Sequence, residues 1–266
     1  MKLDGLRSGG KRLLGASPVM YRLGKRAFVK FKLYNDHKIF KSRYPAASCI
    51  DYDVAALKEM RAGGFYSQYG QDNYLWNEIF KRKPTGFYVD IGGNHPIINS
   101  NSYFFERRGW RGMAFDPLAR AAGQWGKERS AVFHHAAISE TAETRDFIEI
   151  KESQGWEHAL SGFKGFVRDE DMQLYGYLEY PVRAAPLGEF VTPGTHIDLI
   201  MIDVEGAEEI VLRGIDLAAL KPDYVMIENV SEVGGAEAIR RQTIDQGYDL
   251  IARIGAADDL FRRRGL

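Results

Sequence analysis

The chain of 266 residues lacks several features that would place it in a functional class. It has one cysteine, Cys49, which excludes an intramolecular disulfide framework and a cysteine-rich metal site. No stretch approaches 18 uncharged apolar residues, so we expect no transmembrane helix. The N-terminus is charged but has no apolar core, unlike a secretory signal peptide. We therefore predict a cytoplasmic protein, with a peripheral position at the inner membrane face as the alternative.

The formal net charge is zero, but the charge is unevenly distributed along the chain. Residues 1–50 carry 12 Lys and Arg against 2 Asp and Glu, whereas the other residues carry 24 against 34. One interpretation is an amphipathic helix that packs on the rest of the chain with a solvated basic face. The other is an anionic partner, namely a membrane surface, a lipid-linked glycan or an acidic protein. We expect no nucleic-acid partner, because the remainder is acidic and has no recognition motif.

The most informative segment is residues 87–117. The apolar run Phe87–Ile91 contains Asp90 and ends in Gly92 and Gly93, and a second apolar run ends in Asp116. This pattern predicts a strand, a glycine turn, a helix, a second strand and an acid. In open α/β sheets such an arrangement builds a nucleoside-binding crevice at the carboxyl ends of the strands. An acid there can accept hydrogen bonds from ribose hydroxyls, so the segment indicates an adenosyl-type cofactor.

The dinucleotide fingerprint G-x-G-x-x-G is absent from this turn. Asn94, His95 and Pro96 stand where further glycines would be needed, and Pro96 also removes a backbone donor. A nicotinamide-dependent oxidoreductase is therefore a weaker hypothesis. His95 is expected to shape the loop.

Beyond residue 87, strand and helix patterns alternate, which predicts a mainly parallel sheet. The end of the chain predicts an antiparallel pair of strands across Gly255. The expected strands are 87–91, 112–115, 131–137, 197–202, 224–227, 248–254 and 259–263, and the expected helices are 51–61, 100–108, 207–213 and 236–246. Segment 151–181 breaks the alternation and is rich in aromatic residues; it is either a substrate-facing lid or an ordinary packed insertion.

Three segments resemble the FkbM-type family of S-adenosylmethionine-dependent methyltransferases. They are VDIGGN followed by HP, then SNSYFFERRGWRG, and later IDVEGAEEIVLRGID, in that order along the chain. The resemblance covers about residues 66–264. Two mild departures exist, since the first motif more often reads G-A-N or G-A-H, and the acid after the second strand is often Glu rather than Asp116.

This resemblance implies an α/β fold of the Rossmann-like class I methyltransferase type, with a mainly parallel sheet and a C-terminal antiparallel strand pair. We expect a basic, partly helical N-terminal extension over residues 1–65 and a methyltransferase domain over residues 66–266. The resemblance also implies S-adenosylmethionine as the cofactor and O-methylation of a hydroxyl, most often that of a sugar. The expected cofactor-binding residues are Asp90, Gly92, Gly93 and Asn94 around the amino-acid portion, Asp116 on the ribose and Ala137 beside the adenine.

Methyl transfer to a hydroxyl needs alignment and a base that takes up the proton. Asp203 follows the expected central strand, and Glu205 follows two residues later. We predict Asp203, with Glu205 and His158, as the catalytic residues, and Glu228 is an alternative. Asp203, Glu205 and Glu228 could also offer oxygen ligands to Mg²⁺, but carboxylates at strand ends are common without metal, and we predict no metal site.

Two functions from different classes remain after this reasoning. The first is an S-adenosylmethionine-dependent O-methyltransferase whose acceptor is a sugar hydroxyl in a glycan, glycolipid or glycosylated metabolite. The second is a non-catalytic module that binds cofactor or glycan and docks through its basic N-terminus. The sequence leaves the acceptor and the oligomeric state open.

Overall fold

The computed structural model describes residues 37–151, 160–229, 235–255 and 257–266. The chain divides into two compact units at the boundary between Cys49 and Ile50. In the first unit, a helix over residues 37–43 leads into a turn in which Lys41 donates hydrogen bonds to the carbonyls of Pro45 and Ala47. Most of the basic segment predicted at residues 1–50 lies outside the described residues. No helix in the described parts of the chain is both long enough and apolar enough to cross a membrane.

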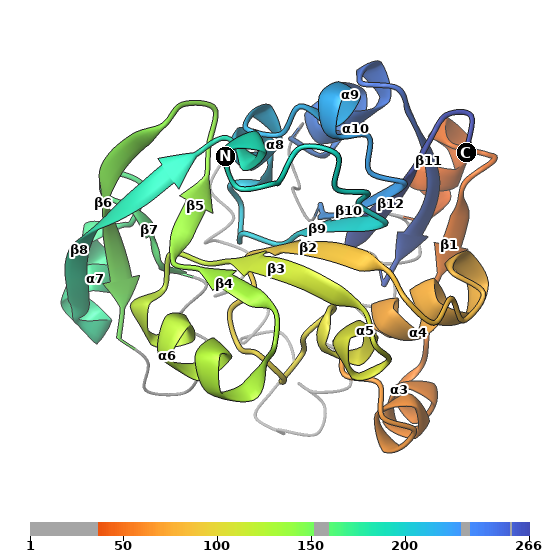
Figure 1. Cartoon of the computed structure of the whole chain (residues 1–266), viewed down its shortest axis with the longest axis horizontal. Helices are drawn as coiled ribbons and strands as arrows, with labels where there is room; N and C mark the ends of the chain where they lie inside the picture. Colours follow the sequence, from red (N-terminus) through yellow and green to blue (C-terminus); the bar gives the residue numbers. More distant parts are fainter. Residues whose placement is uncertain (1–36, 152–159, 230–234, 256) are drawn as a thin grey trace, which may run out of the picture. The chain divides into compact units, whose positions relative to one another are not determined.

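The second unit is built on a mixed sheet that runs mostly parallel (Figure 1). Five strands are parallel to their neighbours in the order β10-β9-β2-β3-β4, and β12 is antiparallel to β10 and to β11 at the other end. The predicted parallel sheet and its C-terminal antiparallel pair are therefore confirmed. The strands are β2 (Phe87–Ile91), β3 (Arg111–Phe115), β4 (Val132–His134), β9 (Leu199–Ile202), β10 (Tyr224–Glu228), β11 (Tyr248–Ile254) and β12 (Asp258–Arg263).

Helices cover both faces of this sheet, which explains why β9 is apolar and buried at every position. Among the core side chains, Trp110 is buried and donates its indole N–H to the carbonyl of Lys83. Its ring lies 4.7 Å from that of Phe80. In Figure 1 one face carries α5 (Tyr103–Arg107) and α6 (Ala119–Glu128), and the other carries α8 (Glu208–Arg213), α9 (Leu217–Leu220) and α10 (Gly235–Asp245). The elements before β2 are β1 (Ser48–Ile50), α3 (Val54–Ala62), α4 (Gln71–Tyr74) and the short π-helix η1 (Leu75–Ile79).

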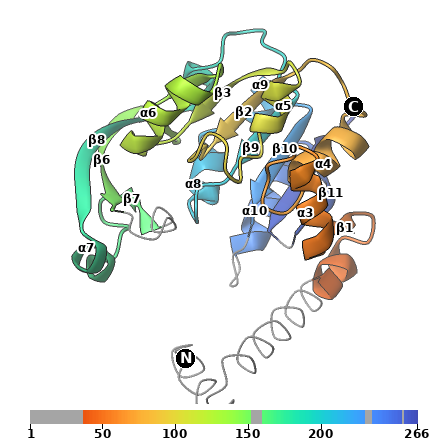
Figure 2. The ribbon, with the colours of Figure 1, turned by 90° about the horizontal axis from the view of Figure 1, so that it is seen from below.

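A second sheet of four strands is not expected from the sequence. It contains β5 (Ala136–Ile138), β6 (Glu143–Ile150), β7 (Gly162–Phe163) and β8 (Tyr177–Ala185), in the order β5-β8-β6-β7. Figure 2 shows this sheet bending away from β3, with β7 and α7 (Asp169–Tyr175) at its far end. The described part of the aromatic segment 151–181 thus supplies β7 and the start of β8 to a sheet that begins at residue 136, with α7 between these two strands.

The single strand expected over residues 131–137 is wrong, because the chain changes sheet at His135. Residues up to His134 pair with β3, whereas Ala136 onward pairs in parallel with β8. His135 sits between them, and its ring nitrogen Nε2 lies 2.8 Å from the carbonyl oxygen of Pro117. The backbone from Ala136 finds a hydrogen-bonding partner in β8 that the edge of the central sheet does not offer, which explains the switch.

Candidate functional site

A cavity of about 600 Å³ lies where the carboxyl ends of β2, β3 and β9 meet the second sheet. Such a volume suits a small-molecule ligand. Eight of the nine residues predicted for the site line this cavity. They are Asp90, Gly92, Gly93, Asn94, Asp116, Ala137, Asp203 and Glu205. The ninth, His158, lies outside the described residues.

The turn after β2 requires glycine because neighbouring atoms of the protein leave no room for a side chain. Gly92 has φ +89°, and a Cβ placed there would lie 1.7 Å from the carbonyl oxygen of Asp203. The N–H groups of Gly92 and Gly93 both donate to the carbonyl of Phe115, at 2.9 and 3.1 Å. A Cβ at Gly93 would lie 2.8 Å from the Trp125 ring. These glycines therefore bring β2, β3 and β9 together at the cavity, and their N–H groups are already paired.

His95 shapes the following loop, as predicted. Its Nδ1 accepts hydrogen bonds from the N–H groups of Ile97 and Ile98, at 3.1 and 3.0 Å. Trp125 donates its indole N–H to the carbonyl of Asn94, so helix α6 holds the same loop from the other side.

Arg129 is a positioning residue that the sequence patterns do not reveal. Its side chain is fully buried and donates to the carbonyl of Pro96 (2.6 Å) and the hydroxyl of Ser102 (2.9 Å). The same guanidinium lies 4.2 Å above the Trp125 ring and pairs with Glu106 at 2.8 Å. Arg129 therefore ties α6 to the cavity loop and to the start of α5. No local motif marks it, because its partners are distant in sequence.

Asp90 is joined to Arg129 through the hydroxyl of Ser102. It is buried, and its Oδ2 accepts a hydrogen bond from Ser102, whose hydroxyl also contacts Arg129. Burial raises the pKa of Asp90, while the Ser102 hydrogen bond and the charge of Arg129 oppose the rise. Ser102 makes no side-chain cap to helix α5, so its hydroxyl serves the carboxylate instead.

Asp116 organises the turn after β3. Its two oxygens accept hydrogen bonds from the N–H groups of Asn94 (2.7 Å) and Leu118 (2.8 Å). Burial raises the pKa of Asp116 to about 6 against these backbone donors. Each carboxylate oxygen has two lone pairs, so both oxygens keep the capacity to accept from a ligand. Tyr180, on β8, donates to the carbonyl of Pro117 or to Glu149 and so joins this turn to the second sheet.

The carboxylates after β9 and β10 form a cluster. Asp203 follows β9 and Glu228 ends the neighbouring parallel strand β10, so the two carboxyl groups lie at adjacent strand ends. Burial and the neighbouring carboxylates raise the pKa of both groups well above the usual range. Asp258 is paired in register with Glu228, and burial and Asp203 raise the pKa of Asp258 to about 7. Gln71 donates to Asp258 at 2.8 Å. Neither Asp258 nor Gln71 is among the site residues that the sequence predicts.

The loop after Asp203 has an unusual backbone. Glu205 has φ +56° and Gly206 has φ +105°. A left-handed conformation is uncommon for a residue other than glycine, and such residues gather at functional sites. Glu208 holds the loop, because its Oε1 accepts from the N–H groups of Val204 (3.2 Å) and Gly206 (2.9 Å).

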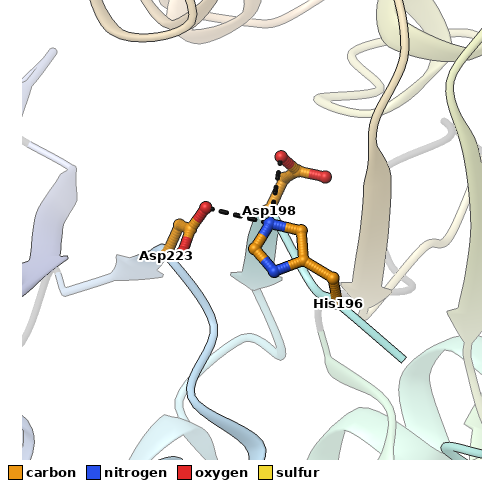
Figure 3. Close-up of side chains that lie close together, drawn as sticks. All are labelled: His196, Asp198 and Asp223. Atoms are coloured by element: carbon orange, nitrogen blue, oxygen red, sulfur yellow. Dashed lines mark ion pairs between the residues drawn. The ribbon is translucent and has the colours of Figure 1, made fainter. Parts of the chain in front are cut away.

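A second group of acids lies at the opposite edge of the sheet, before β9 and β10. His196 Nε2 lies 3.6 Å from Asp198 and 3.1 Å from Asp223 (Figure 3). Within the described residues these three have atoms close enough to share a metal ion. However, Asp198 is paired with Lys83 and with the N–H of Phe87, and Asp223 is paired with Arg263 at 2.9 Å. Both carboxylates are thus already paired with cations, and these ion pairs stabilise the starts of β9 and β10.

Comparison with known proteins identifies the family. A family model described as the methyltransferase FkbM domain matches residues 90–250, which is more than half of the chain. No curated protein and no solved structure matches the chain. The matched residues run from Asp90 through Asp203 and Glu228 into β11, so they include most of the residues that line the cavity. The resemblance found in the motifs is therefore confirmed.

Proposed function

Because the chain belongs to the FkbM methyltransferase domain family, we propose that it is an S-adenosylmethionine-dependent O-methyltransferase of the Rossmann-like class I type. The acceptor is a hydroxyl, that of a sugar in a glycan, glycolipid or glycosylated metabolite. The observation that carries the proposal is the placement of Asp116 and Asp203 around one cavity at the carboxyl edge of a mostly parallel sheet. In open α/β sheets this edge is where nucleoside ligands bind.

The cavity has groups that fit this cofactor. Asn101 lines it and has a buried Oδ1 without a hydrogen-bond partner, which suits a donor on a ligand. Asp116 would hold the ribose hydroxyls, Ala137 would flank the adenine, and Asp90 with Asn94 would bind near the amino-acid portion. When bound, S-adenosylmethionine supplies a methyl group already activated on a sulfonium. The residues of the chain then have to align the acceptor and take up a proton.

We assign to Asp203 the role of the base that takes up the proton of the acceptor hydroxyl. Burial and the neighbouring carboxylates raise the pKa of Asp203, so its ionised form is a stronger base than an exposed carboxylate. Asp203 is partly exposed and lines the cavity, whereas Asp258 is buried behind it. Glu205 is exposed on the same loop and would position the acceptor. His158 stays a predicted catalytic residue.

The first experiment is isothermal titration of the full chain with S-adenosylmethionine and S-adenosylhomocysteine, with NAD as the control. We expect micromolar binding of the first two and no binding of NAD. Binding of NAD alone would favour the oxidoreductase hypothesis. Absence of binding by all three would contradict the cofactor assignment and favour the docking module.

The basic segment of residues 1–50 is the second part of the proposal. Its 12 basic residues would bring the enzyme to an anionic membrane surface or an acidic partner in the cytoplasm. Sedimentation with vesicles of phosphatidylcholine alone and with one-third phosphatidylserine tests this. The full chain should bind only the anionic vesicles, and a chain that starts at residue 50 should bind neither. Equal binding by both chains would contradict the membrane role.

A further inference from the structure

One wall of the cavity comes from the second sheet rather than from the central one. Arg145 and Phe147 lie on β6, Phe163 lies on β7, and Phe166 follows shortly after. All four side chains belong to residues that line the cavity. Phe147 and Phe163 face each other across the β6–β7 pair, with ring centroids 5.8 Å apart and edge to face.

Arg145 rests on these rings. Its guanidinium carbon lies 4.5 Å from the centroid of Phe163 and 5.7 Å from that of Phe166. A guanidinium that contacts a ring through its face keeps the N–H donors at its edge available for hydrogen bonds. The side chain of Arg145 is 31% exposed. Phe163 and Phe166 therefore hold a cation at the cavity with its donors accessible.

Within the described residues, no acidic residue that lines the cavity is paired with Arg145, so its guanidinium is available to a ligand. Two arginines line the cavity, and Arg168 is already engaged by Asp171 through two hydrogen bonds of 2.7 and 2.9 Å. The guanidinium of Arg145 makes no hydrogen bond to any residue that the structure describes. Its nearest carboxylate is that of Glu143 at 3.8 Å, which is itself largely exposed. A pair of that length near water contributes little.

We propose that Arg145, supported by Phe163 and Phe166, binds an oxyanion of the acceptor, so that the acceptor is a sugar bearing a carboxylate or a phosphate. This inference rests on the proposed function and deepens it. The β2, β3 and β9 ends of the cavity carry Asp90, Asp116 and Asp203 and, among the described residues, no lining lysine or arginine, so they offer an anion no cationic partner. The acceptor would therefore be oriented with its anionic group toward β6 and a hydroxyl toward Asp203. Arg matches planar oxyanions through paired N–H donors.

Binding of sugars to the full chain saturated with S-adenosylhomocysteine tests this. The probes are methyl α-D-glucuronide, glucose 6-phosphate and neutral methyl α-D-glucoside, together with their galacto-configured counterparts. We expect at least one anionic sugar to bind at least tenfold more tightly than its neutral counterpart. Arg145→Gln should remove that preference and leave binding of the neutral sugar within twofold. The matched control is Lys164→Gln, which removes a cation next to Phe163 that pairs with Glu179 outside the cavity.

The inference is overturned if no anionic sugar is preferred, or if Arg145→Gln and Lys164→Gln change the preference equally. The ratio between uronide and phosphate identifies the source of the oxyanion. Titration with S-adenosylhomocysteine alone separates the two proposals. If the wild-type chain does not bind it, the proposed function fails; if it binds while no anionic preference exists, only the role of Arg145 fails.

Discussion

The carboxylates at the amino ends of the central strands (the amino edge of the sheet) and those at the carboxyl ends (the carboxyl edge) have very different neighbours. At the amino edge, Asp198 is 2% exposed and is matched by Lys83 and a backbone N–H. At the carboxyl edge, Asp258 is similarly buried at 3%, but its neighbours include Asp203 and Glu228. A buried charge without a cation is destabilising unless it holds a proton. Acids paired with cations therefore stabilise the fold at the amino ends of the strands, and a cluster of acids next to one another lies beside the cavity at the carboxyl ends.

Removal of the proposed base should have the largest effect. Asp203→Asn keeps the size of the side chain and removes the proton acceptor, so methyl transfer should fall by about 100-fold or more. Binding of S-adenosylhomocysteine should stay within a few-fold. The measurement is S-adenosylhomocysteine release with the best sugar from the binding series. Asp249→Asn, at an exposed surface pair with Arg264, is the control. Unchanged turnover in Asp203→Asn would remove the assignment.

The corresponding change at the amino edge should give the opposite result. Asp198→Asn leaves Lys83 without its partner and weakens the hydrogen bond from Phe87, so the free energy of unfolding should fall by about 2 kcal/mol. The folded protein should retain its turnover. Urea unfolding and the same activity assay measure both quantities. If Asp198→Asn lost turnover without loss of stability, the amino edge would have a role in function.

The two edges should also differ in how the stability of the protein depends on pH. The pKa of Asp258 is about 7 in the folded chain against an ordinary value of 3.8. Because the folded value is the higher one, its contribution to stability is complete below about pH 4 and is lost as the pH rises through 7. Asp258→Asn should therefore be more stable than wild type at pH 8, by about 2–4 kcal/mol, and no more stable at pH 4. Unfolding in urea at both pH values is the test, and a pH-independent difference would contradict it.

The smallest effect is expected where no charge changes. Gly123 is exposed in the middle of helix α6, and a Cβ there would meet nothing within 4 Å. Gly123→Ala should raise the free energy of unfolding by up to about 1 kcal/mol, because alanine favours the helix. The gain should be equal at pH 4 and pH 8, which separates a backbone effect from the effect at Asp258. Thermal unfolding at both values measures it.

The sequence predicts the half of the cavity that is made by strand ends. Apolar runs that end in acids are local patterns, so they are enough to place Asp90, Asp116 and Asp203 at one edge of the sheet. Helix α6 is not predicted, although Leu118, Ala121 and Trp125 have helical spacing and are buried. Gly123 and Gly126 weaken the local helix preference there, and tertiary packing of Trp125 overrides it.

The other half of the cavity depends on contacts between distant residues. The pairing of β6 with β8 joins residues 27 (Ile150 with Tyr177) to 41 (Glu143 with Ala184) positions apart. The contact of Arg145 with Phe163 exists only once β6 and β7 are paired. Arg129 reaches Ser102 and Pro96 in the same way. Periodicity within a short window does not contain this information, which explains why the sequence predicts a strand and an insertion where the second sheet lies.

The contact between Gly92 and the carbonyl of Asp203 has a consequence for how relatives are compared. Any side chain at position 92 would collide with the backbone of the neighbouring strand end, whether or not a ligand binds. A homologue that had lost activity would therefore keep this glycine, while position 203 would be free to change its side chain. If Asp203 is the base, the side chain at position 203, rather than the glycine at position 92, is what distinguishes active relatives from inactive ones.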